Sequence, residues 1–387
     1  MKPSHIFLGV ISFSIFGGIN YYLGLRGWQT LGSKIPPLSR PLYWIVFWAL
    51  PLCYIMGQLI GRRYLPGIIK KGLTYLGSYW MGAFFYFLLL VVLIDLLRLI
   101  GIWTGLLPHS FRTPSAGTIT GAIVFLTVTL LLVYGTWNAR KPVVTRYNLD
   151  VDKKAGSIES LHIAMVSDVH LGAIMNKYRL QDMVDRINAL NPDLILFVGD
   201  VVDDEVRGYR EENMSDIFKQ LRSLYGIYAV PGNHEYISGD INEAVAFLEE
   251  SGIHVLRDNC IKIADSFYIA GRDDVAGEHF IQGTRKEPVE LLKDINSSLP
   301  VILMDHQPVA LEKAQAAGVD LQVSGHTHRG QLFPNNFITR KTFELDYGYM
   351  KKGSTHFIVS NGFGTWGPPL RIGNKPEVVD ITMNFRK

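Results

Sequence analysis

The most restrictive feature of this 387-residue chain is the near absence of acidic residues from its first third. Residues 1–138 contain ten lysines and arginines but a single acid, Asp95, so fewer than one position in ten is charged. In residues 139–387 roughly one position in four is charged, as in ordinary soluble domains. A single homogeneous soluble globule is therefore excluded, and we expect two parts that fold in different surroundings.

Four apolar stretches in the first part are long enough to cross a bilayer, whose ~30 Å hydrocarbon core requires about 20 apolar residues in a helix. Tryptophans lie at or near the ends of these stretches, where a membrane interface favours them. Buried helices of a soluble core would instead carry a charged face. We therefore predict a four-helix transmembrane anchor over residues 1–138. The predicted spans are Ile6–Leu25, Leu42–Ile60, Leu73–Ile94 and Gly117–Trp137.

Four crossings place both ends of the chain on the same side of the membrane. That side would carry eight lysines and arginines and the opposite side four, which predicts a multi-pass protein of the cell membrane with a cytoplasmic polar part. Asp95 and Arg98 are the only ionisable residues in or beside a span, and their i, i+3 spacing lets them meet on one helix face. Their place at the end of a full-length span favours an interfacial pair in an anchor over a transport site.

The second part alternates short apolar or β-branched runs with amphipathic helical stretches, which is typical of a layered α/β domain. We predict this domain over residues 161–387, joined to the anchor by a polar linker at 139–160. The expected strands are 162–167, 194–199, 226–230, 267–271, 301–305, 321–324, 356–360 and 378–383. The expected helices are 177–190, 215–224, 241–250, 288–295 and 308–317.

Five clusters of polar residues follow these expected strands. In layered α/β folds ligands bind just beyond the carboxyl ends of the strands, so we expect the five loops to converge on one site. The clusters are Asp168-Val-His170, Gly199-Asp200-Val-Val-Asp203, Gly232-Asn233-His234-Glu235, Asp305-His306-Gln-Pro and Gly325-His326-Thr-His328.

The side chains in these clusters indicate a metal site. Imidazoles and carboxylates without a thiolate favour divalent ions such as Mn, Fe, Zn or Mg. Seven donors are too many for one ion and suit two ions ~3.5 to 4 Å apart with a bridging carboxylate. Each cluster alone also fits a turn, a surface loop or a core histidine, but the five together predict a di-metal site. The seven donors are Asp168, His170, Asp200, Asn233, His306, His326 and His328.

In this order the clusters resemble the signature of the calcineurin-like metallophosphoesterases, which reads D-x-H, G-D-x-x-D, G-N-H-[D/E], an isolated His and G-H-x-H. The resemblance covers roughly Leu161–Met383, and the segment Ser360–Gly373 further resembles the bacterial YkuE-type branch. It implies a two-sheet β-sandwich flanked by helices, in the layer order α-β-β-α. Residues 1–138 lie outside it.

The resemblance also implies a role for each residue of the signature. His234 would lie beside the metals and meet the phosphate or leaving group, and Asp203 would orient a neighbouring histidine. Asp168, His170 and His328 would hold the first ion, Asn233, His306 and His326 the second, and Asp200 would bridge them.

Arg371 lies in the Gly/Pro-rich segment that could return to the site. Its guanidinium could clamp a phosphate or headgroup of the substrate. A solvated loop arginine fits the same sequence equally well.

These features predict a membrane-anchored phosphoesterase that cleaves phosphate ester or pyrophosphate bonds by attack of a hydroxide held between two metal ions. The short linker favours lipid headgroup esters over soluble substrates, and the net charge of −6 on residues 139–387 argues against nucleic acid. Two alternatives remain, a metal-binding membrane sensor or scaffold with a vestigial site, and a small transporter with a regulatory domain. The metal, the preference for monoesters or diesters and the oligomeric state stay open.

Overall fold

The computed structural model of the chain describes residues 3–35, 39–57, 67–203, 206–237, 240–280 and 285–386. The chain divides into two compact units, with the boundary between Gly135 and Thr136. We refer to them as the helical unit and the α/β unit.

The helical unit consists mainly of long apolar helices. Small residues let the helices approach closely. A Cβ atom on Gly77 in the third long helix would overlap the backbone nitrogen of Tyr54 in the second, so only glycine fits there. The elements are α1 (Pro3–Thr30), η1 (Gly32–Lys34), α2 (Arg40–Ile55), α4 (Gly67–Trp103), η3 (His109–Arg112) and α5 (Pro114–Ala139), whose last turn belongs to the α/β unit.

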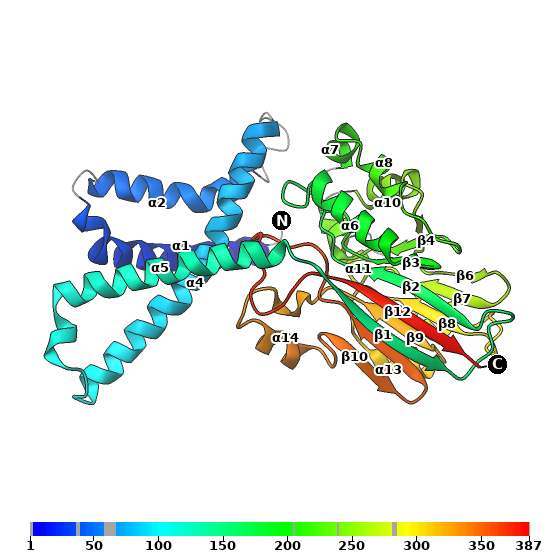
Figure 1. Cartoon of the computed structure of the whole chain (residues 1–387). Helices are drawn as coiled ribbons and strands as arrows, with labels where there is room; N and C mark the ends of the chain where they lie inside the picture. Colours follow the sequence, from blue (N-terminus) through cyan, green and yellow to red (C-terminus); the bar gives the residue numbers. More distant parts are fainter. Residues whose placement is uncertain are drawn as a thin grey trace. The chain divides into compact units, whose positions relative to one another are not determined.

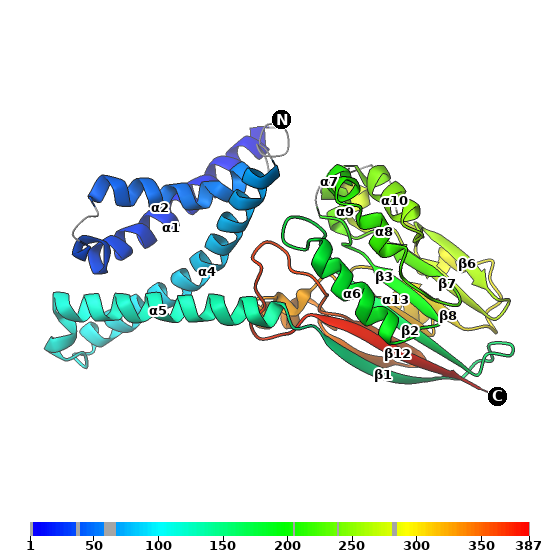
Figure 2. The same ribbon diagram turned by 45° about the horizontal axis from the view of Figure 1, so that its top comes forward.

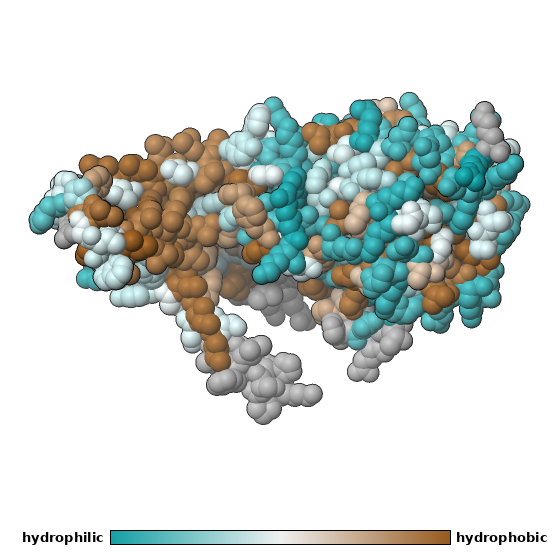
Figure 3. All heavy atoms as spheres, turned by 90° about the horizontal axis from the view of Figure 1, so that it is seen from below, coloured by the Kyte–Doolittle hydropathy of each residue, from teal (hydrophilic) through white to brown (hydrophobic). Residues whose placement is uncertain are grey.

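Two of these helices, α4 and α5, are long and apolar enough to cross a membrane. They contain the predicted spans at residues 73–94 and 117–137. The other two predicted spans fall on α1 and α2, which do not meet the same criteria over their described residues, and residues 58–60 of the second lie outside the described part. On the face shown in Figure 3, apolar side chains cover most of the helical unit, whereas the α/β unit is largely polar.

The α/β unit is built on two six-stranded mixed sheets (Figure 1). The strand order is β1-β12-β2-β3-β4-β5 in the first sheet and β10-β11-β9-β8-β7-β6 in the second. The strands are β1 (Val143–Val151), β2 (Ser160–Val166), β3 (Leu194–Val198), β4 (Ile227–Val230), β5 (His254–Val255), β6 (Asn259–Ile263), β7 (Phe267–Gly271), β8 (Val301–Met304), β9 (Leu321–Ser324), β10 (Gly348–Lys352), β11 (Thr355–Val359) and β12 (Glu377–Phe385).

Alternating side chains of these strands build three apolar cores. The central core lies between the two sheets and includes Ile163 of β2 and Ile302 of β8. A second core lies under α6, α7, α8 and α10, which cover the outer face of the first sheet (Figures 1 and 2). A third core lies under α12 and α13 on the second sheet. The result is an α-β-β-α sandwich, as the resemblance implied.

The helices of this unit are short. Among the described residues most are one or two turns long, and only α6 and α10 have ten residues or more. They are α6 (Lys177–Ala189), α7 (Val206–Glu211), α8 (Met214–Phe218), α9 (Asn233–Ile237), α10 (Ile241–Glu250), α11 (Ala276–Phe280), α12 (Pro288–Leu291), α13 (Leu311–Ala316), η4 (His328–Gly330) and α14 (Asn336–Thr342).

Part of the segment predicted as a linker is a strand. Residues 143–151 form β1, which pairs in parallel with β12 from Val143↔Glu377 to Val151↔Phe385. The sequence analysis did not place this strand because β1 is an edge strand with exposed polar positions, so its sequence lacks the apolar run of a central strand. Its partner β12 lies at the far end of the chain, beyond the reach of any local pattern.

Candidate metal centre

The seven predicted ligand residues all lie two to four residues beyond the end of a strand. The strands that carry them are β2, β3 and β4, which are parallel neighbours in the first sheet, and β8 and β9, which are parallel neighbours in the second. Parallel strands end at the same edge of their sheet, so the five loops meet at one end of the sandwich. The convergence predicted from the sequence is therefore present.

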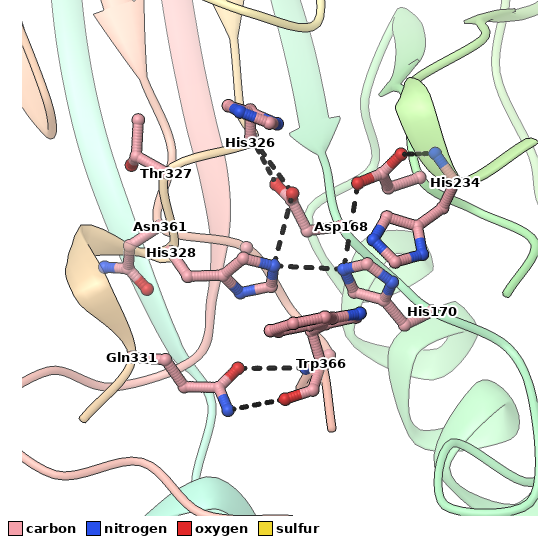
Figure 4. Close-up of polar contacts among 12 residues, drawn as sticks. Asp168, His170, His234, His326, Thr327, His328, Gln331, Asn361 and Trp366 are labelled. Carbon is pink, nitrogen blue, oxygen red and sulfur yellow. Dashed lines mark hydrogen bonds and ion pairs between the residues drawn. The ribbon is translucent and has the colours of Figure 1, made fainter. Parts of the chain in front are cut away.

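The first group of side chains consists of Asp168, His170 and His328, whose ligand atoms lie within 4.8 Å of one another. Nε2 of His170 is 3.0 Å from Nε2 of His328, and the same nitrogen of His328 is 3.4 Å from Oδ1 of Asp168. Figure 4 shows the two imidazoles turned toward each other beside this carboxylate. All three residues are buried.

The second group consists of Asp200, His306 and His326, again within 4.8 Å of one another. Nε2 of His306 lies 3.1 Å from Oδ2 of Asp200, and Nδ1 of His326 lies 2.9 Å from Oδ1 of Asn233. Oδ2 of Asp200 is also 3.9 Å from Nε2 of His170 in the first group. Asp200 therefore lies between the two groups, where a bridging ligand would have to be.

His234 and Asp203 form a pair beside these groups. Nδ1 of His234 is 2.5 Å from Oδ1 of Asp203, and the backbone N–H of His234 donates to Oδ1 of Asp200 at 2.8 Å. Burial by itself would lower the pKa of His234, but the hydrogen bond to Asp203 and the charge of Asp200 raise it to about 9. His234 is therefore protonated at neutral pH, and Asp203 fixes its orientation. Asp203 and His234 also form a third group with His170 that could hold an ion.

The surroundings shift the pKa values of these histidines in different directions. Burial and the positive charge of His306 lower the pKa of His326 to about 4, and burial with the nearby Arg371 holds the pKa of His328 well below its usual value. Both are therefore neutral, the form that binds metals. Burial opposes a charge on His306, but Asp200 raises its pKa well above the usual range.

The glycines of the motifs make room for these side chains. A Cβ atom on Gly325 would overlap Oδ2 of Asp168, and one on Gly199 would overlap Nδ1 of His306. The backbone is also left-handed at five of the seven predicted ligands, an uncommon conformation that surrounding packing must hold. These five are Asp168, His170, Asp200, His326 and His328.

Glu235 has a role that the sequence analysis did not assign. Its buried carboxylate accepts hydrogen bonds from the backbone N–H groups of Asp200, Val201, Val202 and Gly232, at 2.7 to 3.0 Å. It therefore fixes the loop that carries Asp200 against the loop that carries Asn233 and His234. The motif Gly-Asn-His-Glu contains this residue, but only the folded chain shows what its carboxylate binds.

Arg371 does not lie where the substrate-clamp prediction requires it. Its side chain is fully buried, and its guanidinium donates to the carbonyls of Asn361, Gly362, Gly364 and His328. It also donates to Nδ1 of His328 at 3.1 Å. A guanidinium engaged in this way has no face for a substrate, so both the clamp and the solvated loop arginine are wrong. Arg371 instead braces the returning segment and the ring of His328.

The same segment contacts the end of α5. The side-chain amide of Asn138 donates to the backbone carbonyls of Arg371 and Asn374, at 2.9 and 2.6 Å. Asn138 is 2% exposed, so these hydrogen bonds are shielded from water. The last turn of α5 is thereby fixed to the segment that braces His328.

Trp366 is a second residue that the sequence analysis missed. Its indole is 49% exposed and meets the ring of His234 edge-on, with centroids 5.9 Å apart. The side-chain amide of Gln331 holds the Trp366 backbone through two hydrogen bonds, as Figure 4 shows. An exposed indole beside His234 offers an apolar surface next to the candidate site.

These residues fit a pair of divalent ions. Two carboxylates, four imidazoles and an amide oxygen form the donor set that such ions prefer, and no thiolate is among them. His306 donates from Nδ1 to the carbonyl of Val198 at 2.8 Å, which directs Nε2 toward Asp200. Nδ1 of His170 is buried without a hydrogen-bond partner in the described part of the chain, so an ion could engage this ring from either nitrogen.

Comparison with known proteins agrees with this geometry. The profile of the calcineurin-like phosphoesterases matches residues 161–330. A metallophosphoesterase of Aquifex aeolicus is 35% identical over 243 residues, which are 62% of this chain and 91% of that protein. A zebrafish protein described as a transmembrane protein with a metallophosphoesterase domain is 27% identical over 91% of this chain and 83% of its own length.

The metallophosphoesterase YkuE of Bacillus subtilis is 30% identical over 58% of this chain and 79% of that protein. The identity to the Aquifex protein over nearly its whole length, the profile match and the two side-chain groups at the strand ends agree. This chain belongs to the calcineurin-like metallophosphoesterase family.

Proposed function

We propose that the protein is a membrane-anchored di-metal phosphoesterase that hydrolyses phosphate ester or pyrophosphate bonds of lipid-linked substrates. The observation that carries this proposal is the position of Asp200 between the two ligand groups, with the His234–Asp203 pair beside it. Asp168, His170 and His328 would hold the first ion, and Asn233, His306 and His326 the second. Two bound ions would neutralise the phosphate oxygens and lower the pKa of a coordinated water.

The chain's own residues supply the remaining chemistry. Nδ1 of His234 is engaged by Asp203, so Nε2 is the nitrogen that can give a proton to the leaving oxygen. Glu235 holds the loop of Asp200 against the loop of Asn233 through backbone hydrogen bonds. Arg371 fixes the ring of His328 through its Nδ1 atom. These contacts hold the ligands before substrate arrives, which reduces the reorganisation needed in the reaction.

Exposed apolar side chains near the site support a lipid-linked substrate. Phe337 and Ile338 of α14 are 59% and 65% exposed, and Phe333 packs against Phe337. The backbone of Phe333 bonds to Ile372, so this apolar group borders the segment that carries Trp366. Arg340 and Lys341 at the end of α14 add positive charge. Apolar groups with basic neighbours suit a phosphate-bearing amphiphile better than a free nucleotide.

The anchor part of the proposal places four helices, α1, α2, α4 and α5, in the bilayer, with the α/β unit on the cytoplasmic side. Exposed apolar side chains on all four helices support it, as does the lysine and arginine count. Protease digestion of right-side-out and inverted membrane vesicles tests the orientation, because only inverted vesicles should lose the α/β unit.

The function is tested on the full chain in detergent, loaded with Mn²⁺ and incubated with a total bacterial lipid extract or with a panel of soluble nucleotides. Released phosphorus species are followed by ³¹P NMR. The comparison proteins are Asp200→Asn and a matched Asp216→Asn variant, whose aspartate is exposed on α8.

Loss of a lipid phosphate signal with the wild type and Asp216→Asn, but not with Asp200→Asn, would establish a lipid phosphohydrolase. Turnover confined to nucleotides would overturn the substrate class and keep the chemistry. The absence of metal-dependent turnover on either set would favour the sensor or scaffold.

A further inference from the structure

The helical unit contains a cavity of about 510 Å³, lined by α1, η1, α2, α4 and α5. Its volume falls within the ~300 to 1,000 Å³ typical of small-molecule sites. Most of its lining is apolar, including Leu23, Phe87, Val91 and Val124. Four charged side chains also line it, namely Arg26, Lys34, Asp95 and Arg98.

One pair of these charges is satisfied within the protein. Nη2 of Arg26 lies 2.7 Å from Oδ2 of Asp95, and the hydroxyl of Tyr22 donates to the same oxygen at 2.5 Å. The i, i+3 spacing that could join Asp95 to Arg98 is therefore not used, because the acid turns to α1 instead. Asp95 and Arg26 balance each other.

The other two cations of the lining are Arg98 and Lys34. Neither Arg98, one turn beyond Asp95 on α4, nor Lys34 of η1 has a hydrogen bond or ion pair from its side chain within the described residues. An unpaired charge beside apolar surface is costly, and inside a bilayer it is costlier still. The cavity thus combines an apolar wall with an excess of two positive charges.

We infer that this cavity binds an anionic phospholipid, with its phosphate on Arg98 and Lys34 and an acyl chain against α4 and α5. Arginine suits this ligand because its planar guanidinium can make two hydrogen bonds to one phosphate. The apolar wall matches an acyl chain, which a free phosphate lacks. This inference rests on the proposed membrane location of the helical unit, and it concerns a site separate from the metal centre.

Native mass spectrometry of the full chain in mild detergent tests it with dioleoyl phosphatidylglycerol as the probe and dioleoyl phosphatidylcholine as the reference lipid. The wild-type protein should retain phosphatidylglycerol in preference to phosphatidylcholine. Arg98→Gln should weaken this binding about tenfold or more, the usual loss when a hydrogen bond to a charged group is removed. Arg40→Gln removes the same charge at the start of α2, outside the cavity lining, and should bind as the wild type does.

A second pair of variants tests the apolar part. Gly117 lines the cavity and a Cβ atom there meets nothing within 4 Å, so Gly117→Leu should occupy part of the cavity and displace the acyl chain. Gly72→Leu is its control, because Gly72 of α4 also has open space around a Cβ but lies outside the lining.

The inference is overturned if Arg98→Gln binds phosphatidylglycerol as tightly as wild type, or if Arg40→Gln loses as much. It is equally overturned if Gly117→Leu retains the lipid, or if glycerol 3-phosphate alone displaces it, since the site would then recognise only the anion. Lipid retention is measured without turnover, so a failed phosphoesterase assay would leave this result unaffected.

Discussion

The two units of this protein place their polar and apolar side chains in opposite ways. In the α/β unit the large apolar residues are mostly buried, and ionisable side chains such as Asp200, Glu235 and Arg371 are buried with them in dense hydrogen-bond networks. In the helical unit many large apolar residues, among them Phe13, Leu97 and Phe125, are exposed. The described acid of that unit, Asp95, is held by Arg26 and Tyr22.

This contrast bears on the solvent that each unit requires. A soluble domain buries charges only where partners or ligands compensate them, and a long helix exposes apolar side chains on every face only where lipid replaces water. Buried charges in one unit and exposed apolar surface in the other therefore support the proposal of a water-facing reaction centre and a lipid-facing anchor.

The largest effect should come from the residue between the two ligand groups. Asp200→Asn should lower kcat about 1,000-fold or more because it weakens the proposed metal bridge, and His326→Ala should do the same. Turnover of bis-p-nitrophenyl phosphate and metal content by mass spectrometry check this result. Far-UV circular dichroism of the detergent-solubilised chain should stay unchanged. Full activity in either variant would contradict the di-metal assignment.

The next largest effect concerns stability. Arg371→Met leaves several buried carbonyls and Nδ1 of His328 without their donor, and should lower the free energy of unfolding of the α/β unit by about 3 kcal/mol. Arg340→Met, at an arginine near the end of α14 rather than in the buried network, should change it by less than about 0.5 kcal/mol. Urea unfolding followed by tryptophan fluorescence gives both values. Equal effects would show that the buried network is not what Arg371 stabilises.

The position of Arg371 illustrates where sequence reasoning stops. The metal ligands could be predicted because each lies a few residues beyond a strand, so local patterns locate them. The path of the segment 361–374 depends on its pairing with the loop around Gln331, for instance the hydrogen bond from the Ile372 N–H to the Gln331 carbonyl. The residues next to Arg371 in the sequence do not specify that contact, so the burial of Arg371 could not be predicted from the sequence. The same holds for β1, whose partner is distant in the chain.

His234 gives a smaller effect that depends on pH. His234→Gln should lower kcat about 100-fold for alkyl phosphate esters, whose leaving group needs a proton, and less for p-nitrophenyl esters. The pKa of His234 in the folded protein is about 9, above its ordinary value, so wild-type activity on alkyl esters should fall as the pH rises through about 9. Asp203→Asn removes the negative charge that helps to raise this pKa and leaves only a weaker neutral acceptor, so the fall should move to lower pH. Rate profiles from pH 6 to 10 measure this shift, and an identical profile in Asp203→Asn would contradict it.

The same pair affects stability. A folded-state pKa of about 9 lies above the unfolded value of ~6.5, so the stabilisation from His234 and Asp203 is complete below pH ~6.5. It is lost as the pH rises through about 9. Thermal melts of the wild type and of Asp203→Asn should therefore differ most at low pH and converge at high pH.

The smallest expected effect tests whether the anchor acts on catalysis. Gly77→Leu should disturb the contact between α2 and α4, because its side chain would meet the backbone of Tyr54, and so lower the stability of the helical unit. Turnover of a soluble ester should change by less than about twofold, whereas turnover of a lipid ester in nanodiscs should fall further. Parallel assays of the two substrates on one preparation make the comparison. An equal loss on both would mean that the metal centre depends on helix packing.

The pairing of β1 with β12 also has a consequence for synthesis. β1 follows α5 directly, but β12, which separates β1 from β2 in the first sheet, is made only when the ribosome reaches Glu377–Phe385. At about 5 to 20 residues per second, the ribosome leaves β1 without its partner for roughly ten to fifty seconds. The apolar helices have emerged by then, so the order of synthesis would let the proposed anchor enter the membrane before the reaction centre is complete. A nascent chain halted before Glu377 would contain the helical unit yet be unable to close its first sheet.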